Sequence, residues 1–267
     1  MIEKIGLGLI TCNREDFFKK SYKSIPYEKL DEFVVISDGE QYNYLSSIST
    51  YFIQHHENLG VGKSKNQALR YLLEKGCTHI FLMEDDIIIK DPNVFNAYIQ
   101  ASKDTGIKHF NFALHGNYNL DSYGNPVIKK TVEYPSKTKI SLYHNVLGAL
   151  SYYHADVLKS VGFMDENYFN AMEHVDHTLE IIKAGFHPPF RWFADIENSR
   201  NYLEDIVGEH KESEIRKDPE EWRKNFMKAC EYFEKKQGFS VLNPTKEYVS
   251  PLESVLKSLV EMHHKNK

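Results

Sequence analysis

Residues 79–86 read HIFLMEDD, an apolar strand-forming run that leads directly into Glu84, Asp85 and Asp86. Similar runs recur through the first half of the chain, and polar or turn-forming residues follow each of them. Short apolar strands that alternate with helical segments are typical of a parallel sheet with helices on both faces. The pattern therefore predicts an α/β fold.

Three further strands of the same sheet are expected at residues 5–10, 33–36 and 51–53, with a helix at residues 64–74. Parallel sheets of this kind bind ligands at the carboxyl ends of their strands. The residues at these ends are polar, and we expect them to converge on one edge of the sheet: Thr11, Asn13, Asp38, Asn58 and Asp86.

The rest of the chain is less regular. Alternation at residues 137–143 predicts antiparallel strands, and residues 171–183 predict a helix that ends at Ala184-Gly185. Residues 209–236 mix both charges with spaced aromatic residues, which is typical of a solvated helix lying on a domain. Residues 252–260 form an amphipathic pattern with three open uses: packing on its own domain, a homodimer contact, or docking on a membrane surface.

Composition limits the class of protein. The chain has 267 residues, 41% of them hydrophobic, and a net charge of −5, so it is neither disordered nor a nucleic-acid protein that relies on bulk basic charge. Its 3 cysteines form no CxxC pair, which argues against a thiolate zinc site and a disulfide scaffold. No apolar run reaches the roughly 18 residues of a membrane span, and the first residues do not resemble a signal peptide. A cytoplasmic protein is expected.

Three adjacent carboxylates at a strand end repel one another unless a positive group offsets them. Mg²⁺ and Mn²⁺ are suited to carboxylate oxygens. In an extended chain Glu84 and Asp86 point to the same side, so these two can face one metal ion while Asp85 points elsewhere. The alternative interpretation is a charged turn or a helix cap.

Residues 60–64, GVGKS, resemble the end of a phosphate-binding P-loop. The position of the first P-loop glycine is Glu57, however, whose carboxylate has the wrong charge to face phosphates. The segment also follows the third expected strand rather than the first. An NTPase is therefore not favoured.

A second charged cluster, at residues 173–177, begins the helix expected near residue 171. Its four ionisable side chains face solvent or a polar cleft, because burying all of them is costly. The spacing does not fit an HExxH zinc site. Two interpretations remain open: a general base, and a helix N-terminus with local salt bridges.

The order of these elements resembles family 2 glycosyltransferases of the GT-A fold over residues 1–215, with 216–267 as a C-terminal helical extension. The opening ITCNR, residues 10–14, resembles the PTYNR-like turn of that family, and VISDGE, 35–40, its VDDGS-like turn. NLGVGKSKNQA, 58–68, is similar to NxGxxxARN and also accounts for the apparent P-loop. LMEDD, 82–86, is similar to FLDxDD. VGFMDENYF, 161–169, followed by EHVD, 173–176, is similar to the last motif.

The resemblance implies roles for individual residues. The nucleotide would be contacted by a set of residues around the strand ends: Thr11, Asn13, Arg14, Asp38, Asn58, Lys65 and Asp85. Gly148 would lie beside the donor sugar. Asp86 and Glu84 would hold Mn²⁺ or Mg²⁺, with His210 completing the site and His187 as the alternative. The family's catalytic aspartate is replaced here by His174, so the base is His174, Glu173 or Asp176, and Glu173 is preferred because it keeps a carboxylate near that position.

The function implied is a metal-dependent, inverting transfer of a hexosyl or N-acetylhexosaminyl group from a nucleotide-sugar, most favourably a UDP-sugar, to a hydroxyl of a glycan or glycolipid. Surface polysaccharide synthesis in the cytoplasm, with or without contact to the inner face of the membrane, would suit such an enzyme. Two alternatives remain: a sugar-nucleotidyltransferase or other nucleotide–metal enzyme, and a catalytically inactive relative that binds nucleotides or glycans.

Overall fold

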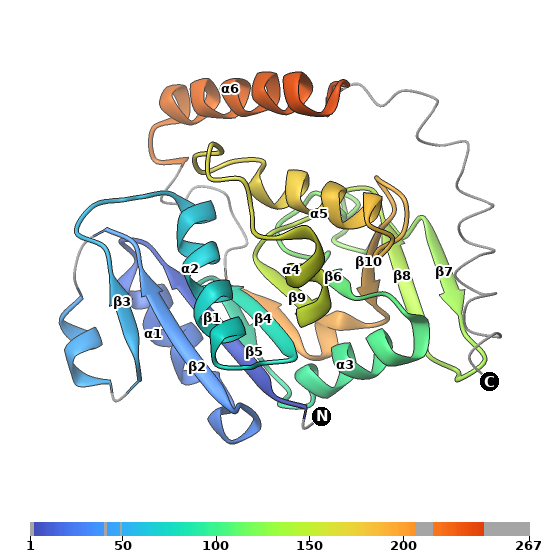
Figure 1. Ribbon diagram of the computed structural model, residues 1–267, viewed down its shortest axis with the longest axis horizontal. Coiled ribbons are helices and arrows are strands. Elements are labelled where there is room, and N and C mark those ends of the chain that lie inside the picture. The colour runs from blue at the N-terminus through green and yellow to red at the C-terminus, as the bar shows by residue number, and fades with distance from the viewer. Residues whose placement is uncertain (1–2, 40–41, 49, 207–215, 243–267) are drawn as a thin grey trace.

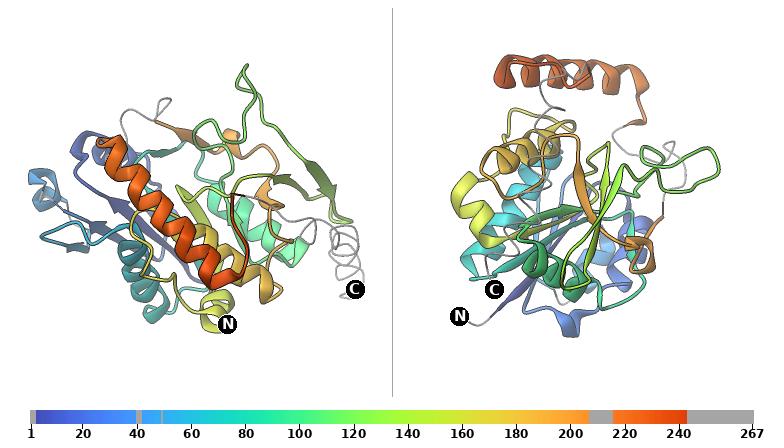
Figure 2. Two further views of the ribbon diagram at one scale, coloured as in Figure 1. Left: turned by 90° about the horizontal axis from the view of Figure 1, so that it is seen from above. Right: turned by 90° about the vertical axis from the view of Figure 1, so that its right-hand side faces the viewer.

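The computed structural model describes residues 3–39, 42–48, 50–206 and 216–242. Figure 1 shows a central sheet with helices on both sides and one long helix, α6, lying across the top. The views in Figure 2 agree that α6 forms a separate layer above the rest. The fold is the mainly parallel α/β arrangement predicted from the sequence.

The central sheet has six strands in the order β3-β2-β1-β4-β9-β6. Strands β1 to β4 are parallel, and β9 runs antiparallel to both of its neighbours. The bounds are Ile5–Thr11 for β1, Glu32–Ser37 for β2, Phe52–Gln54 for β3, His79–Glu84 for β4, His109–Asn111 for β6 and Leu150–His154 for β9. All four strands expected in the first half of the chain are confirmed.

Alternation along the strands divides the core between the two faces of the sheet. Leu7 and Leu9 of β1 belong to a large buried cluster that includes residues of α1 (Glu15–Lys23) and α3 (Val94–Thr105). Ile10 points the other way, into a cluster with α2 (Val61–Glu74), α4 (Ala155–Val161) and α5 (Glu173–Lys183). The sheet is thus covered on both faces, as a parallel sheet requires.

Close packing of α2 on β1 depends on a glycine. A Cβ at Gly8 would lie 2.6 Å from the Ala68 Cβ of α2, closer than two carbon atoms can approach. This contact allows α2 to pack closely on the middle of β1, one helical turn after Lys65.

Two smaller sheets complete the domain. One pairs β8 (Lys139–Tyr143) with β7 (Lys130–Glu133) and β10 (Phe193–Ile196), all antiparallel, which confirms the strands expected near residue 140. The other pairs β5 (Ile87–Ile89) with β11 (Leu203–Asp205). Short 3-10 helices lie at Tyr27–Lys29, Asn43–Ser47 and Ser199–Asn201.

Helix α6 spans Pro219–Gln237 and begins at Asp218, whose side chain accepts hydrogen bonds from two backbone amides of the first turn. Its second half is fixed to the domain: Ala229, Cys230 and Phe233 are buried in a cluster with aromatic residues that precede β10. The amphipathic segment at 252–260 lies outside the described residues. Within the described part of the chain, no helix is long and apolar enough to cross a membrane.

Candidate active site

A cleft of about 390 Å³ lies at the carboxyl edge of the central sheet. The ends of β1 and β4, the loop before β9, the start of α5 and the first half of α6 supply its walls. Thr11, Asp38, Asn58 and Asp86 all line it, so the predicted convergence of strand-end residues is confirmed. Asn13 is not part of the lining; it packs against Gly39, where an added Cβ would come within 2.5 Å of its side-chain oxygen.

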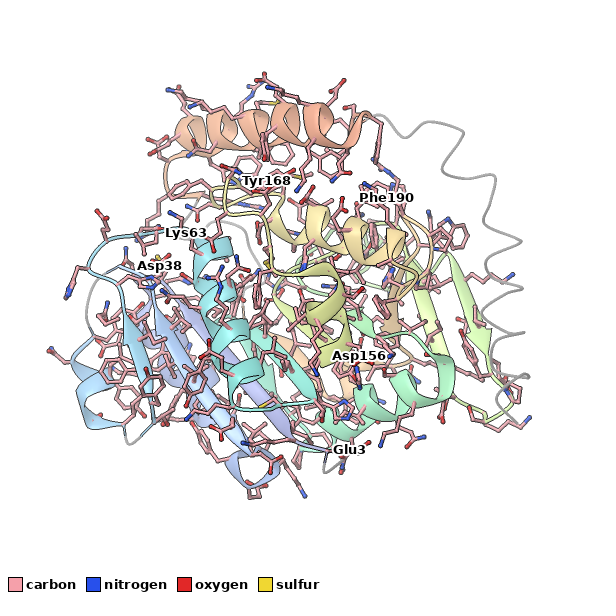
Figure 3. The ribbon with its side chains drawn as sticks, viewed as in Figure 1. Glu3, Asp38, Lys63, Asp156, Tyr168 and Phe190 are labelled. Carbon is pink, nitrogen blue, oxygen red and sulfur yellow. The ribbon has the colours of Figure 1, made fainter. Side chains whose placement is uncertain are left out.

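Asp38 fixes the loop that leads into α2. Its Oδ1 accepts hydrogen bonds from the Leu59 amide and from His55 Nδ1, both at 2.8 Å, and its Oδ2 accepts one from the Gly60 amide at 3.1 Å. Asp38 is only 3% exposed, and Figure 3 shows it at the upper end of the sheet, below the loop to α2. Its hydrogen bonds shape the wall of the cleft.

Asp85 is fully buried beneath the cleft. The Thr11 hydroxyl donates to its Oδ2 at 2.6 Å, and the Arg14 guanidinium donates to its Oδ1. Burial raises the pKa of Asp85 to about 7, although the Arg14 charge acts in the opposite direction. The Thr11 hydroxyl and one guanidinium nitrogen of Arg14 are therefore occupied by Asp85.

Asp86 has one carboxylate oxygen that accepts no hydrogen bond from the described part of the chain. Its Oδ2 lies 3.3 Å from Arg14 Nη2, but its Oδ1 is buried without a hydrogen-bond partner among the described residues, and so is Arg14 Nε. His115 lies on the same side: burial would lower its pKa, but the charges of Asp86 and Asp205 outweigh burial and raise the pKa to about 9.

Lys65 joins two carboxylates that are far apart in the sequence. Its ammonium group lies 2.7 Å from Glu84 Oε1 and 3.2 Å from Glu173 Oε1, and it donates to the Gly148 carbonyl at 3.1 Å. The side chain is 2% exposed, and burial opposes its charge, yet Glu84 and Glu173 raise its pKa above the ordinary range. Lys65 is thus an internal counter-ion rather than a group exposed toward a nucleotide.

Glu173 and His174 form a second link in this chain of charges. His174 Nδ1 lies 3.0 Å from Glu173 Oε1. Burial would raise the pKa of Glu173, but Lys65 and His174 hold it well below the ordinary range. A carboxylate with so low a pKa is a weak proton acceptor. His174, with 21% of its side chain exposed, lines the cleft.

Gly148 allows this cluster to close. A Cβ at this position would lie 3.0 Å from His174 Nδ1 and 3.0 Å from Lys65 Nζ, so both side chains use the space that a larger residue would fill. The predicted small residue does line the cleft.

Besides Asn13 and Lys65, two described residues that were predicted for the site do not line the cleft. Asp176, a candidate base, is 1% exposed and points toward α6, where its oxygens bind Lys236 Nζ at 2.7 Å and Gln237 Nε2 at 2.6 Å. His187 is also misplaced for metal binding, because its ring nitrogens bond to the Pro188 carbonyl and the Ala194 amide. His210 lies outside the described residues.

The cleft also contains residues that the sequence did not single out for a site: His115, Tyr118, Asn145, Arg216, Trp222 and Phe226. Trp222 and Phe226 were recognised only as the apolar spacing of a helix. The other four lie outside the named helices and strands, where no periodicity indicates a role.

A divalent cation fits one part of this arrangement. Asp86 Oδ1 is a hard anionic oxygen that is buried in the cleft and not satisfied by the described protein residues, which is the kind of ligand Mg²⁺ and Mn²⁺ take. Glu84 is a poorer candidate ligand than predicted, because Lys65 occupies its Oε1. Within the described ranges no three His, Cys, Asp or Glu side chains cluster closely enough to hold a metal by themselves. Further ligands would have to come from a bound substrate.

Comparisons with known proteins agree with this architecture. No protein-family model matches the chain. An uncharacterized glycosyltransferase of Acanthamoeba polyphaga mimivirus is 27% identical over 216 residues, which cover 75% of this chain and 80% of that protein. The solved structure of GalNAc-T7 with UDP, GalNAc and Mn²⁺ matches 98% of this chain and 55% of its own, with 12% identity and a TM-score of 0.54. S. aureus TarS 1-349 in complex with UDP-GlcNAc matches 67% of this chain and 53% of its own, with 17% identity and a TM-score of 0.47.

The fold is that of the GT-A glycosyltransferases. The chain is a glycosyltransferase by this fold together with its sequence relationship, which confirms the class inferred from the motifs. It spans about half the length of the solved structures it matches. Its assignment to family 2 and its division at residue 215 stay predictions.

Proposed function

We propose that the protein transfers a sugar from a nucleotide-sugar, in the first instance a UDP-sugar, to a hydroxyl group of a glycan, with inversion at the anomeric carbon. One observation carries this proposal: Asp86 Oδ1, a buried carboxylate oxygen with no partner among the described residues, and His174, a partly exposed imidazole, belong to residues that line the same cleft. The Asp86 oxygen is suited to binding the metal ion that accompanies the diphosphate of a donor. The His174 imidazole is suited to accepting the proton of the acceptor hydroxyl. The UDP and Mn²⁺ bound to GalNAc-T7 support the same choice of donor and metal for a chain of like fold.

Asp86 and Arg14 form the leaving-group side of the proposed site. Asp86 Oδ1 would hold Mn²⁺ or Mg²⁺, which when bound neutralises charge that develops on the departing diphosphate. Arg14 Nε, which is buried and has no acceptor among the described residues, would donate a hydrogen bond to a diphosphate oxygen. The two unsatisfied atoms belong to side chains that already contact each other through Arg14 Nη2 and Asp86 Oδ2.

His174 is the proposed base. It would accept the proton of the acceptor hydroxyl while that oxygen forms its bond to the anomeric carbon and the bond to the diphosphate breaks. Glu173 accepts the Nδ1 hydrogen bond of His174 at 3.0 Å, so it would leave Nε2 unprotonated and stabilise the imidazolium that forms. Glu173, which the sequence favoured as the base, is therefore proposed as a positioning residue for His174.

Location and pathway belong to the same proposal. A glycan or glycolipid acceptor, surface polysaccharide synthesis and a cytoplasmic enzyme at or near the membrane follow from the resemblance to family 2 alone. Residues 252–260, which could supply a dimer or membrane contact, lie outside the described residues.

The reaction is tested by incubating the protein with UDP-, GDP-, CDP- and dTDP-sugars in the presence of Mn²⁺ and measuring released nucleoside diphosphate. We expect release from at least one donor, and its loss when EDTA removes the metal. Formation of pyrophosphate from a nucleoside triphosphate and a sugar phosphate would instead identify a nucleotidyltransferase. Donor binding without release would identify an inactive relative.

A further inference from the structure

Two aromatic rings of α6 stand in the wall of the cleft. Trp222 and Phe226 are four residues apart on the helix, and their rings are nearly parallel, with centroids 5.3 Å apart and planes at 13°. Both are half-buried and both line the cleft that contains Asp86 and His174. We call this pair the α6 aromatic pair.

The aromatic pair is held from both ends. The Arg216 guanidinium lies 4.9 Å from the Trp222 ring centroid, and its Nη2 donates to the Tyr118 hydroxyl at 3.2 Å. Phe226 and Val175, the residue after His174, both pack against the same buried cluster. The rings therefore have a fixed position in the wall of the cleft that also contains the proposed base.

The two halves of α6 differ in burial. From Ala229 onward the helix is fixed to the domain by Phe233 and by Lys236, which forms ion pairs with Asp165 at 2.8 Å and Asp176 at 2.7 Å. In the first half, no residue from 219 to 228 is buried. In Figure 1 α6 overlies α5, and in Figure 3 Tyr168 lies just below it. The second half of α6 is thus fixed to the domain, and the first half places the partly exposed rings of the aromatic pair at the edge of the cleft.

We propose that the α6 aromatic pair is the acceptor subsite and takes a pyranose ring of the acceptor glycan. The apolar C–H face of a pyranose ring stacks on an aromatic face, while its hydroxyl groups reach polar neighbours, here Tyr118 and Arg216. The aromatic pair lines the same cleft as Val175 and His174, which favours the acceptor over the donor's base, because the acceptor hydroxyl must reach the proton acceptor. This inference rests on the proposed glycosyl transfer and adds to it the site that selects the acceptor.

Binding is tested through tryptophan fluorescence, since the chain has only 2 tryptophans, Trp192 and Trp222. In the Trp192→Phe variant, the emission reports on Trp222 alone. The probes are the methyl α- and β-glycosides of glucose, galactose, mannose and N-acetylglucosamine, and UDP with Mn²⁺. We expect at least one glycoside to change the emission in a saturable manner. A change with UDP but with no glycoside would assign the rings to the donor base, and no change with any probe would also overturn the proposal.

The kinetic test uses the glycoside that accelerates nucleotide release most. Trp222→Ala should raise the KM for that glycoside about tenfold. Trp222→Tyr should restore most of the loss, because a ring is again present. Met227→Ala, on an exposed position of the same helix, is the matched control.

An unchanged KM in Trp222→Ala overturns the acceptor subsite while leaving the transferase assignment intact. If the wild-type protein releases no nucleotide from any donor, the proposed function itself fails. The fluorescence titration still decides in that case whether the aromatic pair binds a sugar.

Discussion

The cleft has two electrostatically different sides, one built around the half-buried Arg14 and the other around the buried Lys65. On the Arg14 side, the guanidinium contacts Asp85 and Asp86 and leaves Asp86 Oδ1 without a partner among the described residues. On the Lys65 side, the ammonium group forms ion pairs with Glu84 and Glu173, and Glu173 in turn contacts the His174 imidazole. Glu84 and Asp86 are two residues apart, yet Lys65 occupies Oε1 of Glu84, whereas Oδ1 of Asp86 has no partner among the described residues. The comparison separates a leaving-group side from a proton-transfer side.

The largest effect is expected from removing the cation of the Lys65 side. Lys65→Met leaves Glu84 and Glu173 close together without their shared counter-ion, and breaking a buried ion pair costs about 3–5 kcal/mol of unfolding free energy. Urea denaturation measures this loss. Lys63→Met, at an exposed position of the same helix, is the control and should unfold almost as the wild type does. Equal stability of the two variants would contradict the role of Lys65.

On the Arg14 side the expected effect is on activity. Asp86→Asn replaces the proposed metal ligand by a neutral amide, and we expect nucleotide release in Mn²⁺ to fall about a thousandfold, because a bound metal supplies several kcal/mol of charge stabilisation. Direct titration with Mn²⁺ and UDP should show weaker binding. The control is Asp16→Asn, whose side chain is 91% exposed on α1. Unchanged metal dependence in Asp86→Asn would remove Asp86 from the site.

Gly148→Ala probes how closely the Lys65 side is packed. The new Cβ would lie 3.0 Å from both His174 and Lys65, so one of them must move, at a cost of about 1–3 kcal/mol in stability. Nucleotide release should fall while UDP binding changes little. Gly62→Ala is the matched control, because its nearest neighbour would be Glu173 Cβ at 3.4 Å, an ordinary contact.

The smallest effect concerns acid stability and contrasts two histidines of α5. His174 lines the cleft, whereas His177 is buried and its Nε2 donates to the Gly162 carbonyl at 3.0 Å. Burial lowers the pKa of His177 to about 4, so the unfolded state binds more protons below pH 6.5. Stability is therefore complete above about pH 6.5 and falls as the pH drops toward 4.

Between pH 7 and pH 5.5 this one group should lower the unfolding free energy by about 1 kcal/mol. Urea denaturation at the two pH values measures it. His177→Leu should reduce the pH dependence, and His56→Gln, at an exposed position, should not.

The strand ends could be predicted because their signal is local. An apolar strand followed by a polar residue is visible in six to eight residues, and parallel strands bring such ends together wherever the chain turns. Thr11, Asp38, Asn58 and Asp86 therefore came to one cleft as expected. The helix expected at residues 64–74 is present as α2, although it begins at Val61.

Partnerships over long sequence distances were not predictable. Lys65 lies 108 residues before Glu173, and nothing in either motif shows that the two side chains share a charge. For the same reason the sequence could not decide which of Glu173, His174 and Asp176 is the base. The first turn of α5 borders both the cleft and α6, so residues next to each other in the sequence contact different parts of the structure. The place of Trp222 depends on how α6 packs, which its own sequence does not encode.

The most direct test of the account compares His174→Gln with the wild-type protein. The account predicts that nucleotide release in the presence of an accepted glycoside falls about a hundredfold or more, while UDP-sugar affinity in Mn²⁺ stays the same and His56→Gln behaves as the wild type does. A variant that turns over at the wild-type rate would contradict the assignment of His174 as the base.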